Sequence, residues 1–173
     1  VEQLIVSGWE VVVLDNLSTG KIDNLKHLDH SRLEIAIGSI LDPSQIEKAL
    51  KGVGVVFHLA AMADIVPSIE DPVSYFEVNA KGTLNMVEAS KRHGVRKFIY
   101  AASSSCYGMP SELPTTEEAS IAPKYPYALT KWLGEEVVRH WGEVYGLPWV
   151  SLRLFNVFGT RSRTSGAYGA VMG

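Results

Sequence analysis

Tyr127 and Lys131, in the stretch "YPYALTK" (125–131), are the residues of this sequence best spaced to share one chemical task. Residues four apart lie on one face of an α-helix, so the phenol and the ammonium can reach the same ligand. A neighbouring ammonium favours the phenolate, which is a usable general base. The spacing alone is a weak signal, because the sequence holds seven tyrosines and amphipathic helices commonly carry tyrosine and lysine.

The segments around this pair strengthen the prediction. A strand is predicted over 96–104, and its end runs into consecutive hydroxyl side chains in "ASSS". Pro126 favours the first position of a helix, which places Tyr127 in the first turn, near the strand ends. Ser103 is therefore a candidate partner of Tyr127, although a serine run after a strand is also typical of an ordinary turn.

The rest of the chain alternates short β-branched runs with helical patterns, without a low-complexity linker or an internal repeat. Strands are predicted over 9–15, 32–38, 53–61, 96–104 and 148–156. Helices are predicted over 43–50, 71–94 and 126–145, with 1–7 as the end of another helix. This alternation predicts an α/β fold, a doubly wound (Rossmann-like) parallel sheet whose ligands bind beyond the carboxyl ends of the strands.

Asp15 ends the first predicted strand and is followed by Asn16 in "NLSTGK". An acid at this place in a dinucleotide fold accepts hydrogen bonds from the adenosine ribose and repels a 2'-phosphate, which favours NAD over NADP. The alternative is that Asp15 only starts a turn with Asn16.

The glycine-rich phosphate loop that accompanies such an acid is missing. "GVG" (52–54) precedes a strand instead of following one, and "GAYGAVMG" (166–173) has no strand-loop-helix context. We therefore expect the first strand and its loop before Val1, and most of the substrate domain after Gly173. On this interpretation 1–173 is a partial NAD-binding domain, and 157–173 leads into the substrate-binding region.

Composition narrows the function classes. A formal charge of -3 without a long basic run predicts no nucleic-acid partner. No apolar stretch approaches the roughly 18 residues that span a bilayer, and no secretory signal opens the chain, so we expect a cytoplasmic protein without a membrane partner. Cys106 is the single cysteine, which excludes an internal disulfide; with no metal-ligand spacing around it, it indicates a buried inert thiol and no metal site.

Six segments in consistent order make the chain similar to the extended short-chain dehydrogenase/reductase family, and within it to the NAD-dependent nucleotide-sugar epimerases and dehydratases. They are "VVLDNLSTG", "VFHLAA", "VNAKGTLNMVEAS", "FIYAASSSCYG", "YPYALTK" and "LRLFNVFGTR". The resemblance covers nearly all of the chain.

The resemblance implies the roles of the catalytic residues. Tyr127 would be the base, Lys131 would hold the nicotinamide ribose and favour the phenolate, and Ser103 would bind the reacting sugar hydroxyl. Ser104 and Ser105 would lie beside the substrate.

The resemblance also implies a set of ligand-binding positions. Those for NAD are Asp15, Asn16, Ser39, Ile40, Leu59, Ala60, Ala61 and Asn79, with Tyr127 and Lys131; Asn156 would lie near the substrate diphosphate. Ser39 departs from the family pattern, where an acid is usual. Asn79 has the alternative of a mid-helix polar residue bonded to nearby backbone, and His58 is interpreted as a core histidine outside the site.

The reaction type is indicated by the segment after Ser103. Dehydratases of the family carry a carboxylate there, whereas this chain continues Ser104, Ser105, Cys106. This favours 4-epimerisation: Tyr127 takes the 4-hydroxyl proton, hydride passes to NAD, and hydride returns to the other face of the ketone. The resemblance implies a UDP-sugar, closest to N-acetylhexosamines or uronic acids. A dehydratase, a reductase or a non-catalytic NAD-binding scaffold remain alternatives.

Family members of this kind pair two long helices across a two-fold axis, so the resemblance implies a homodimer. The apolar residues expected on the pairing faces are Val78, Leu84 and Val87 in one helix and Leu133, Val137, Trp141 and Val144 in the other.

Overall fold

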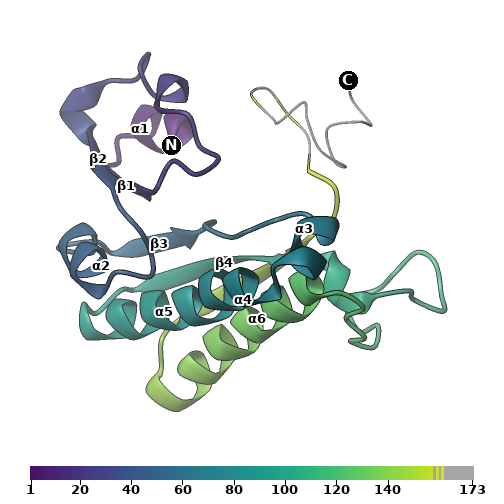
Figure 1. Ribbon diagram of the computed structural model, residues 1–173. Coiled ribbons are helices and arrows are strands. Elements are labelled where there is room, and N and C mark those ends of the chain that lie inside the picture. Colours follow the sequence, from purple (N-terminus) through teal and green to yellow (C-terminus); the bar gives the residue numbers. More distant parts are fainter. Residues whose placement is uncertain (158, 160, 162–173) are drawn as a thin grey trace.

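The computed structural model describes residues 1–157, 159 and 161 (Figure 1). The stretch "GAYGAVMG" and most of 157–173 lie outside the described residues. Over the part that is described, no helix is both long and apolar enough to cross a membrane.

All five predicted strands are present, each shorter than its predicted range, and β3 is shortened most. They are β1 (Val11–Asp15), β2 (Leu33–Ile37), β3 (Val55–His58), β4 (Lys97–Ser103) and β5 (Trp149–Leu154). Every pairing between them is parallel, and helices connect them, which confirms the α/β, Rossmann-like class.

The strands form two separate sheets, as expected if residues 1–173 do not include the first strand of the fold. β1 pairs with β2, and β3, β4 and β5 form a second sheet in that order, with no pairing between β1 and β3. Figure 1 shows the β1–β2 pair standing apart from β3 and β4. In the doubly wound order one more strand lies between these two, and none of the described strands fills that position.

Helices begin and end where the capping residues predict. The short helix α1 spans Glu2–Val6, and α2 (Pro43–Ala49) begins after Asp42, whose carboxylate accepts a hydrogen bond from the Ser44 amide at 2.9 Å. The long helix α6 (Pro126–Tyr145) starts on its proline and ends at Gly146, whose φ of 70° is the left-handed conformation that glycine adopts readily.

The predicted helix over 71–94 is continuous but not regular. It comprises α4 (Pro72–Tyr75), the π-helical segment η3 (Phe76–Gly82) and α5 (Thr83–Arg92). The π segment was not predicted, because hydrophobic periodicity does not reveal where a helix widens by one residue per turn.

Short helices in the connections were also missed. They are α3 (Ile65–Glu70) and the 3₁₀ turns η1 (Ile22–Asn24), η2 (His30–Arg32) and η4 (Ser104–Tyr107).

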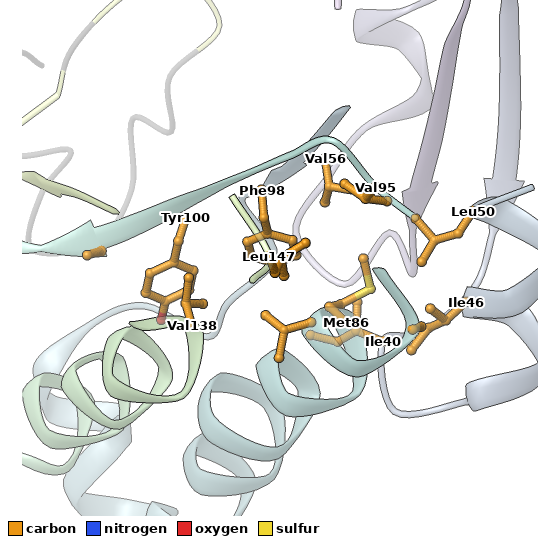
Figure 2. Close-up of a cluster of buried hydrophobic side chains, with 13 residues drawn as sticks. Ile40, Ile46, Leu50, Val56, Met86, Val95, Phe98, Tyr100, Val138 and Leu147 are labelled. Carbon is orange, nitrogen blue, oxygen red and sulfur yellow. The ribbon is translucent and has the colours of Figure 1, made fainter. Parts of the chain in front are cut away.

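The core lies between the β3–β4–β5 sheet and helices α2, α5 and α6. Figure 2 shows Phe98 and Tyr100 of β4 pointing toward the helices that carry Met86 and Val138. Phe98, Tyr100 and Val138 are completely buried, and burial of side chains of this size stabilises by about 1.5–3 kcal/mol each. α5 and α6 are therefore fixed against β4, the strand that ends at Ser103.

Gly134 is a point of close approach between α6 and the sheet. A β-carbon at this position would lie 2.9 Å from the Asn79 carbonyl oxygen, and closer still to the Tyr100 hydroxyl. Both neighbours are buried and cannot move aside cheaply, so only glycine allows this approach.

We predict that Gly134→Ala destabilises the protein by about 1–3 kcal/mol through overpacking, although alanine ordinarily stabilises a helix relative to glycine. Urea denaturation of the complete protein measures the change, with His140→Ala, on the exposed side of α6, as the control. An unchanged or higher stability of Gly134→Ala would mean that α6 does not pack this closely.

Candidate active site

The end of β4 and the first turn of α6 bring two predicted catalytic residues together. The Tyr127 hydroxyl donates to Ser103 Oγ at 3.4 Å. This is longer than a typical hydroxyl hydrogen bond, as is common at sites that tighten when substrate binds. A substrate hydroxyl placed between the two oxygens could bond to both.

Ser103 also forms the strand-end turn that was its alternative interpretation. Its Oγ accepts from the Ser105 amide at 3.2 Å and lies 2.8 Å from Ser105 Oγ, at the start of η4. The same oxygen therefore caps the turn and faces Tyr127, so the two interpretations are compatible.

Lys131 lies one turn further along α6 and is only 4% exposed. Its Nζ lies 4.4 Å from the centroid of the Tyr100 ring, and the Tyr100 hydroxyl donates to the Lys131 carbonyl at 3.2 Å. Burial lowers the pKa of Lys131 to about 8, and the nearby Glu135 carboxylate opposes that shift. Lys131 is therefore mostly charged at neutral pH, in a site that favours the neutral amine.

Asn79 is completely buried in the π-helical segment, and its amide bonds only to protein groups. Its Oδ1 accepts from the Met62 amide at 2.8 Å, and its Nδ2 donates to the Met62 carbonyl at 3.0 Å and to Thr130 Oγ1 at 3.1 Å. Thr130 in turn donates to the Tyr127 carbonyl at 3.1 Å. Asn79 thus ties the segment after β3 to the helix of Tyr127.

His58 is the core histidine that was expected. Its Nε2 lies 2.9 Å from Thr83 Oγ1, which donates its own proton to the Asn79 carbonyl at 2.6 Å. His58 is therefore the donor to Thr83. Burial, reinforced by the charge of Lys131, lowers the pKa of His58 to about 3, so the ring is neutral.

Asp15 and Asn16 lie at the carboxyl end of β1 and both form turn hydrogen bonds, as the alternative interpretation predicted. Asp15 Oδ1 accepts from the Leu17 amide at 2.7 Å, and Asn16 Oδ1 accepts from the Ser18 amide at 3.1 Å. A β-carbon at Gly20 would lie 2.9 Å from Asp15 Oδ2. The glycine therefore leaves space beside the second carboxylate oxygen, where a hydroxyl group could be bound.

The other predicted positions differ in accessibility. Ile40 is a core residue, and the Ser39 amide donates to Gln45 Oε1 at 2.6 Å. The segment directly after β3 is more open, with Leu59 and Ala60 exposed, Ala61 half-buried and Asn156 exposed after β5. Ser104 is half-buried in η4. Among the described residues, its side chain makes no hydrogen bond to Ser103 or Tyr127.

Some residues around the site carried no usable sequence signal. The Tyr75 ring meets the Tyr127 ring edge-on at 6.5 Å, and its hydroxyl donates to the Ala63 carbonyl. Tyr100 was predicted only as a strand residue.

Cys106 is buried, and burial raises its pKa, so it is a neutral thiol, as expected. The described residues include no group of three His, Cys, Asp or Glu side chains placed to hold a metal ion.

The family model of the NAD dependent epimerase/dehydratase family matches residues 1–172, and the chain belongs to this family. A UDP-glucose 4-epimerase of Lacticaseibacillus casei is 38% identical over 163 residues, covering 92% of this chain and 47% of that protein. The chain thus spans about half the length of the curated relatives it matches.

Solved structures of the same family have a similar fold. The UDP-glucose 4-epimerase of Thermus thermophilus, in complex with NAD, has a TM-score of 0.90 at 38% identity, over 98% of this chain and 55% of that one. A dTDP-glucose 4,6-dehydratase of Streptomyces venezuelae, a double mutant with NAD bound, has a TM-score of 0.90 at 26% identity, over 97% and 55%. The family resemblance of the six segments is confirmed.

Burial of Lys131 predicts a distinctive pH dependence of stability. Between its folded pKa of about 8 and its unfolded value, the unfolded chain binds more protons, so this residue makes stability rise with pH. Lys131→Met removes the buried charge. We expect the variant to be more stable than wild type at about pH 7, and the difference in free energy of unfolding to shrink by about pH 9.5.

Urea denaturation at the two pH values measures the free energy of unfolding of wild type and of Lys131→Met. Lys124→Met, at an exposed lysine, is the control, and its difference from wild type should be the same at both pH values. A difference between Lys131→Met and wild type that is equal at both pH values would contradict the burial of a charged lysine.

Proposed function

We propose that the protein containing this chain is an NAD-dependent epimerase of a nucleotide-diphosphate sugar, acting at C4 of a UDP-hexose derivative through a 4-keto intermediate. The observation that carries the proposal is the Tyr127 hydroxyl 3.4 Å from Ser103 Oγ, with buried Lys131 one turn further along the same helix. The names of the relatives supply the substrate class, which includes UDP-glucose and, in a structure from Methanobrevibacter ruminantium, UDP-N-acetylglucosamine.

The residues present fit NAD. Asp15, with one carboxylate oxygen beside Gly20, would bind the adenosine ribose hydroxyls, and the exposed segment at Leu59 and Ala60 would pass along the cofactor. Lys131 would bind the nicotinamide ribose. NAD supplies a hydride acceptor that is restored in each turnover, so the reaction has no net redox change. We propose that residues 1–173 are part of this NAD-binding domain, with 157–173 leading into the substrate-binding region.

The chain's own residues would move the proton. The Lys131 ammonium favours the Tyr127 phenolate, which accepts the proton of the sugar 4-hydroxyl. Ser103 Oγ holds that hydroxyl in place, and its bond to Ser105 fixes its direction. After the ketone has turned in the site, Tyr127 returns the proton to the new 4-hydroxyl.

The segment after Ser103 supports epimerisation over dehydration. Removing water from C5 and C6 needs a further acid and base, and η4 offers the neutral thiol of Cys106 and hydroxyl groups in their place. The epimerases are also the more similar neighbours, at 38% identity against 26% for the dehydratase. A non-catalytic scaffold would have no use for a buried lysine beside a tyrosine–serine pair.

Replacing Tyr127 by Phe removes the proton acceptor and keeps the ring. We predict that turnover of the complete protein with a UDP-hexose and NAD falls by about 10²-fold or more, the usual contribution of general acid–base catalysis. Tyr125→Phe, at an exposed tyrosine two positions earlier, should leave turnover within about twofold. Near-normal activity of Tyr127→Phe would refute the mechanism.

We also propose a homodimer, formed through α4, η3 and α6. The pairing face expected from the sequence needs correction, because Val87 is 0% exposed and Val78, Val137 and Trp141 pack against the core. These side chains cover the protein's own sheet. The apolar side chains that stay exposed on these elements include Val73, Phe76, Tyr125 and Leu129, and Val144 of the predicted set is exposed as well.

Light scattering of the complete protein at micromolar concentration should give the mass of a dimer, and Phe76→Glu should shift it toward monomer because a charge would be buried in the interface. Val6→Glu, at an exposed apolar residue of α1, should leave the dimer intact. A monomeric wild type would exclude the proposed assembly.

A further inference from the structure

Arg153, near the end of β5, joins the segments that hold the catalytic residues. It lies beside Ala102 in the register of β4, next to Ser103. Its Nη1 donates to the Tyr107 hydroxyl in η4 at 3.0 Å and to the Glu117 carbonyl, in the loop before α6, at 3.3 Å. The guanidinium also lies over the Trp132 ring of α6, at 5.3 Å.

Glu135, one turn after Lys131 on α6, receives the remaining contact of Arg153. Arg153 Nε lies 2.9 Å and 3.1 Å from the two carboxylate oxygens, and Glu135 is only 6% exposed. A carboxylate at such a depth needs a partner, because an unpaired buried charge is strongly destabilising. This buried pair differs from the other ion pairs of α6, whose side chains are much more exposed.

Lys131 faces few groups that can carry charge. Those that the described residues place beside it are His58 of β3, which burial keeps neutral, and Tyr100 of β4, whose raised pKa keeps its phenol protonated. On neighbouring elements, Lys81 of η3 pairs with Glu77, and Arg92 of α5 pairs with Glu47 of α2; all four side chains reach the surface.

Of the groups that face Lys131, Glu135 supplies the negative charge. Residues four apart on a helix lie on the same face, so the carboxylate stands over the turn that carries the ammonium. Arg153 binds this carboxylate directly and fixes its position, whereas Lys131 is affected by its charge from beyond ion-pair distance.

We propose that Glu135 and Arg153 are positioning residues of the catalytic site: Glu135 keeps the buried Lys131 in its charged form, and Arg153 sets the strength of that interaction while it locks α6 to β5 and η4. The inference rests on the proposed function for its catalytic meaning. A purely structural pair would fasten α6 to β5 without any effect on the charge of Lys131.

Two variants of the complete protein separate these roles, because they remove charges of opposite sign from one ion pair. Glu135→Gln removes the negative charge and leaves Arg153⁺, so the titration midpoint of Lys131 should fall by at least about 0.5 pH unit. Arg153→Met removes the nearby cation, so the midpoint should rise by at least about 0.5 pH unit.

The readout is the NMR titration of the Lys131 side chain in protein labelled with ¹³C-lysine, with its signal assigned by its loss in Lys131→Arg. Glu136→Gln, which breaks an exposed ion pair with Arg139 on the same helix, is the matched control and should shift the midpoint by less than about 0.2 pH unit. The alkaline limb of kcat/KM against pH should move in the same directions as the NMR midpoints.

Midpoints that move in the same direction, or do not move, would overturn the proposal. If circular dichroism shows that one variant does not fold, the other still tests the proposal, because a shift of the Lys131 midpoint in a defined direction is expected for each. If neither variant folds, the pair has a structural role alone, and the proposal is overturned. Absence of turnover in wild type would refute the proposed function alone, since the Lys131 titration needs no activity.

Discussion

The burial of the Lys131 ammonium is the constraint on which the rest of this structure depends. A charge that is 4% exposed needs compensation, and each neighbour of Lys131 contributes to it. The Tyr100 ring lies against the ammonium, Glu135 supplies the opposite charge, and Gly134 lets the helix lie close enough to β4 for the ring to reach it. Each of these contacts is made by α6 or by the strand beneath it.

The same packing determines where the oxygens of Ser103 and Tyr127 lie. β4 ends at Ser103 and α6 begins at Pro126, so fixing the helix to the strand sets the distance between Ser103 Oγ and the Tyr127 hydroxyl. Two polar connections complete the arrangement. Asn79, in the π-helical segment, ties the segment after β3 to α6 through Thr130, and Arg153 ties β5 to η4 and to α6. Stability and chemistry therefore depend on one set of contacts.

Much of this arrangement could be predicted from the sequence, where local rules act. Pro126 and Gly146 define both ends of α6, Asp42 begins α2, and the β-branched runs locate all five strands. The proximity of Ser103 and Tyr127 could be predicted because a four-residue spacing on a helix and a serine run after a strand are local patterns.

What could not be predicted depends on contacts between distant segments. The π-helical turn at Asn79 has no periodic signature. Val87 was assigned to a dimer face because its helix has apolar residues on more than one side, and only packing shows that it belongs to the core. Arg153 belongs to "LRLFNVFGTR", a segment that carries the family resemblance. Its pairing with Glu135 could not be predicted, because the two residues are 18 apart in the sequence.

The central claim, that Tyr127, Ser103 and Lys131 serve epimerisation at C4, is tested most directly by following a label at that carbon. The complete protein, with NAD, is incubated with a UDP-hexose deuterated at C4, and the products are analysed by NMR. The account predicts the 4-epimer with deuterium retained at C4, because hydride leaves and returns within one site. Deuterium at C6 of a 4-keto-6-deoxy sugar, loss of the label to solvent, or recovery of unchanged substrate would contradict it.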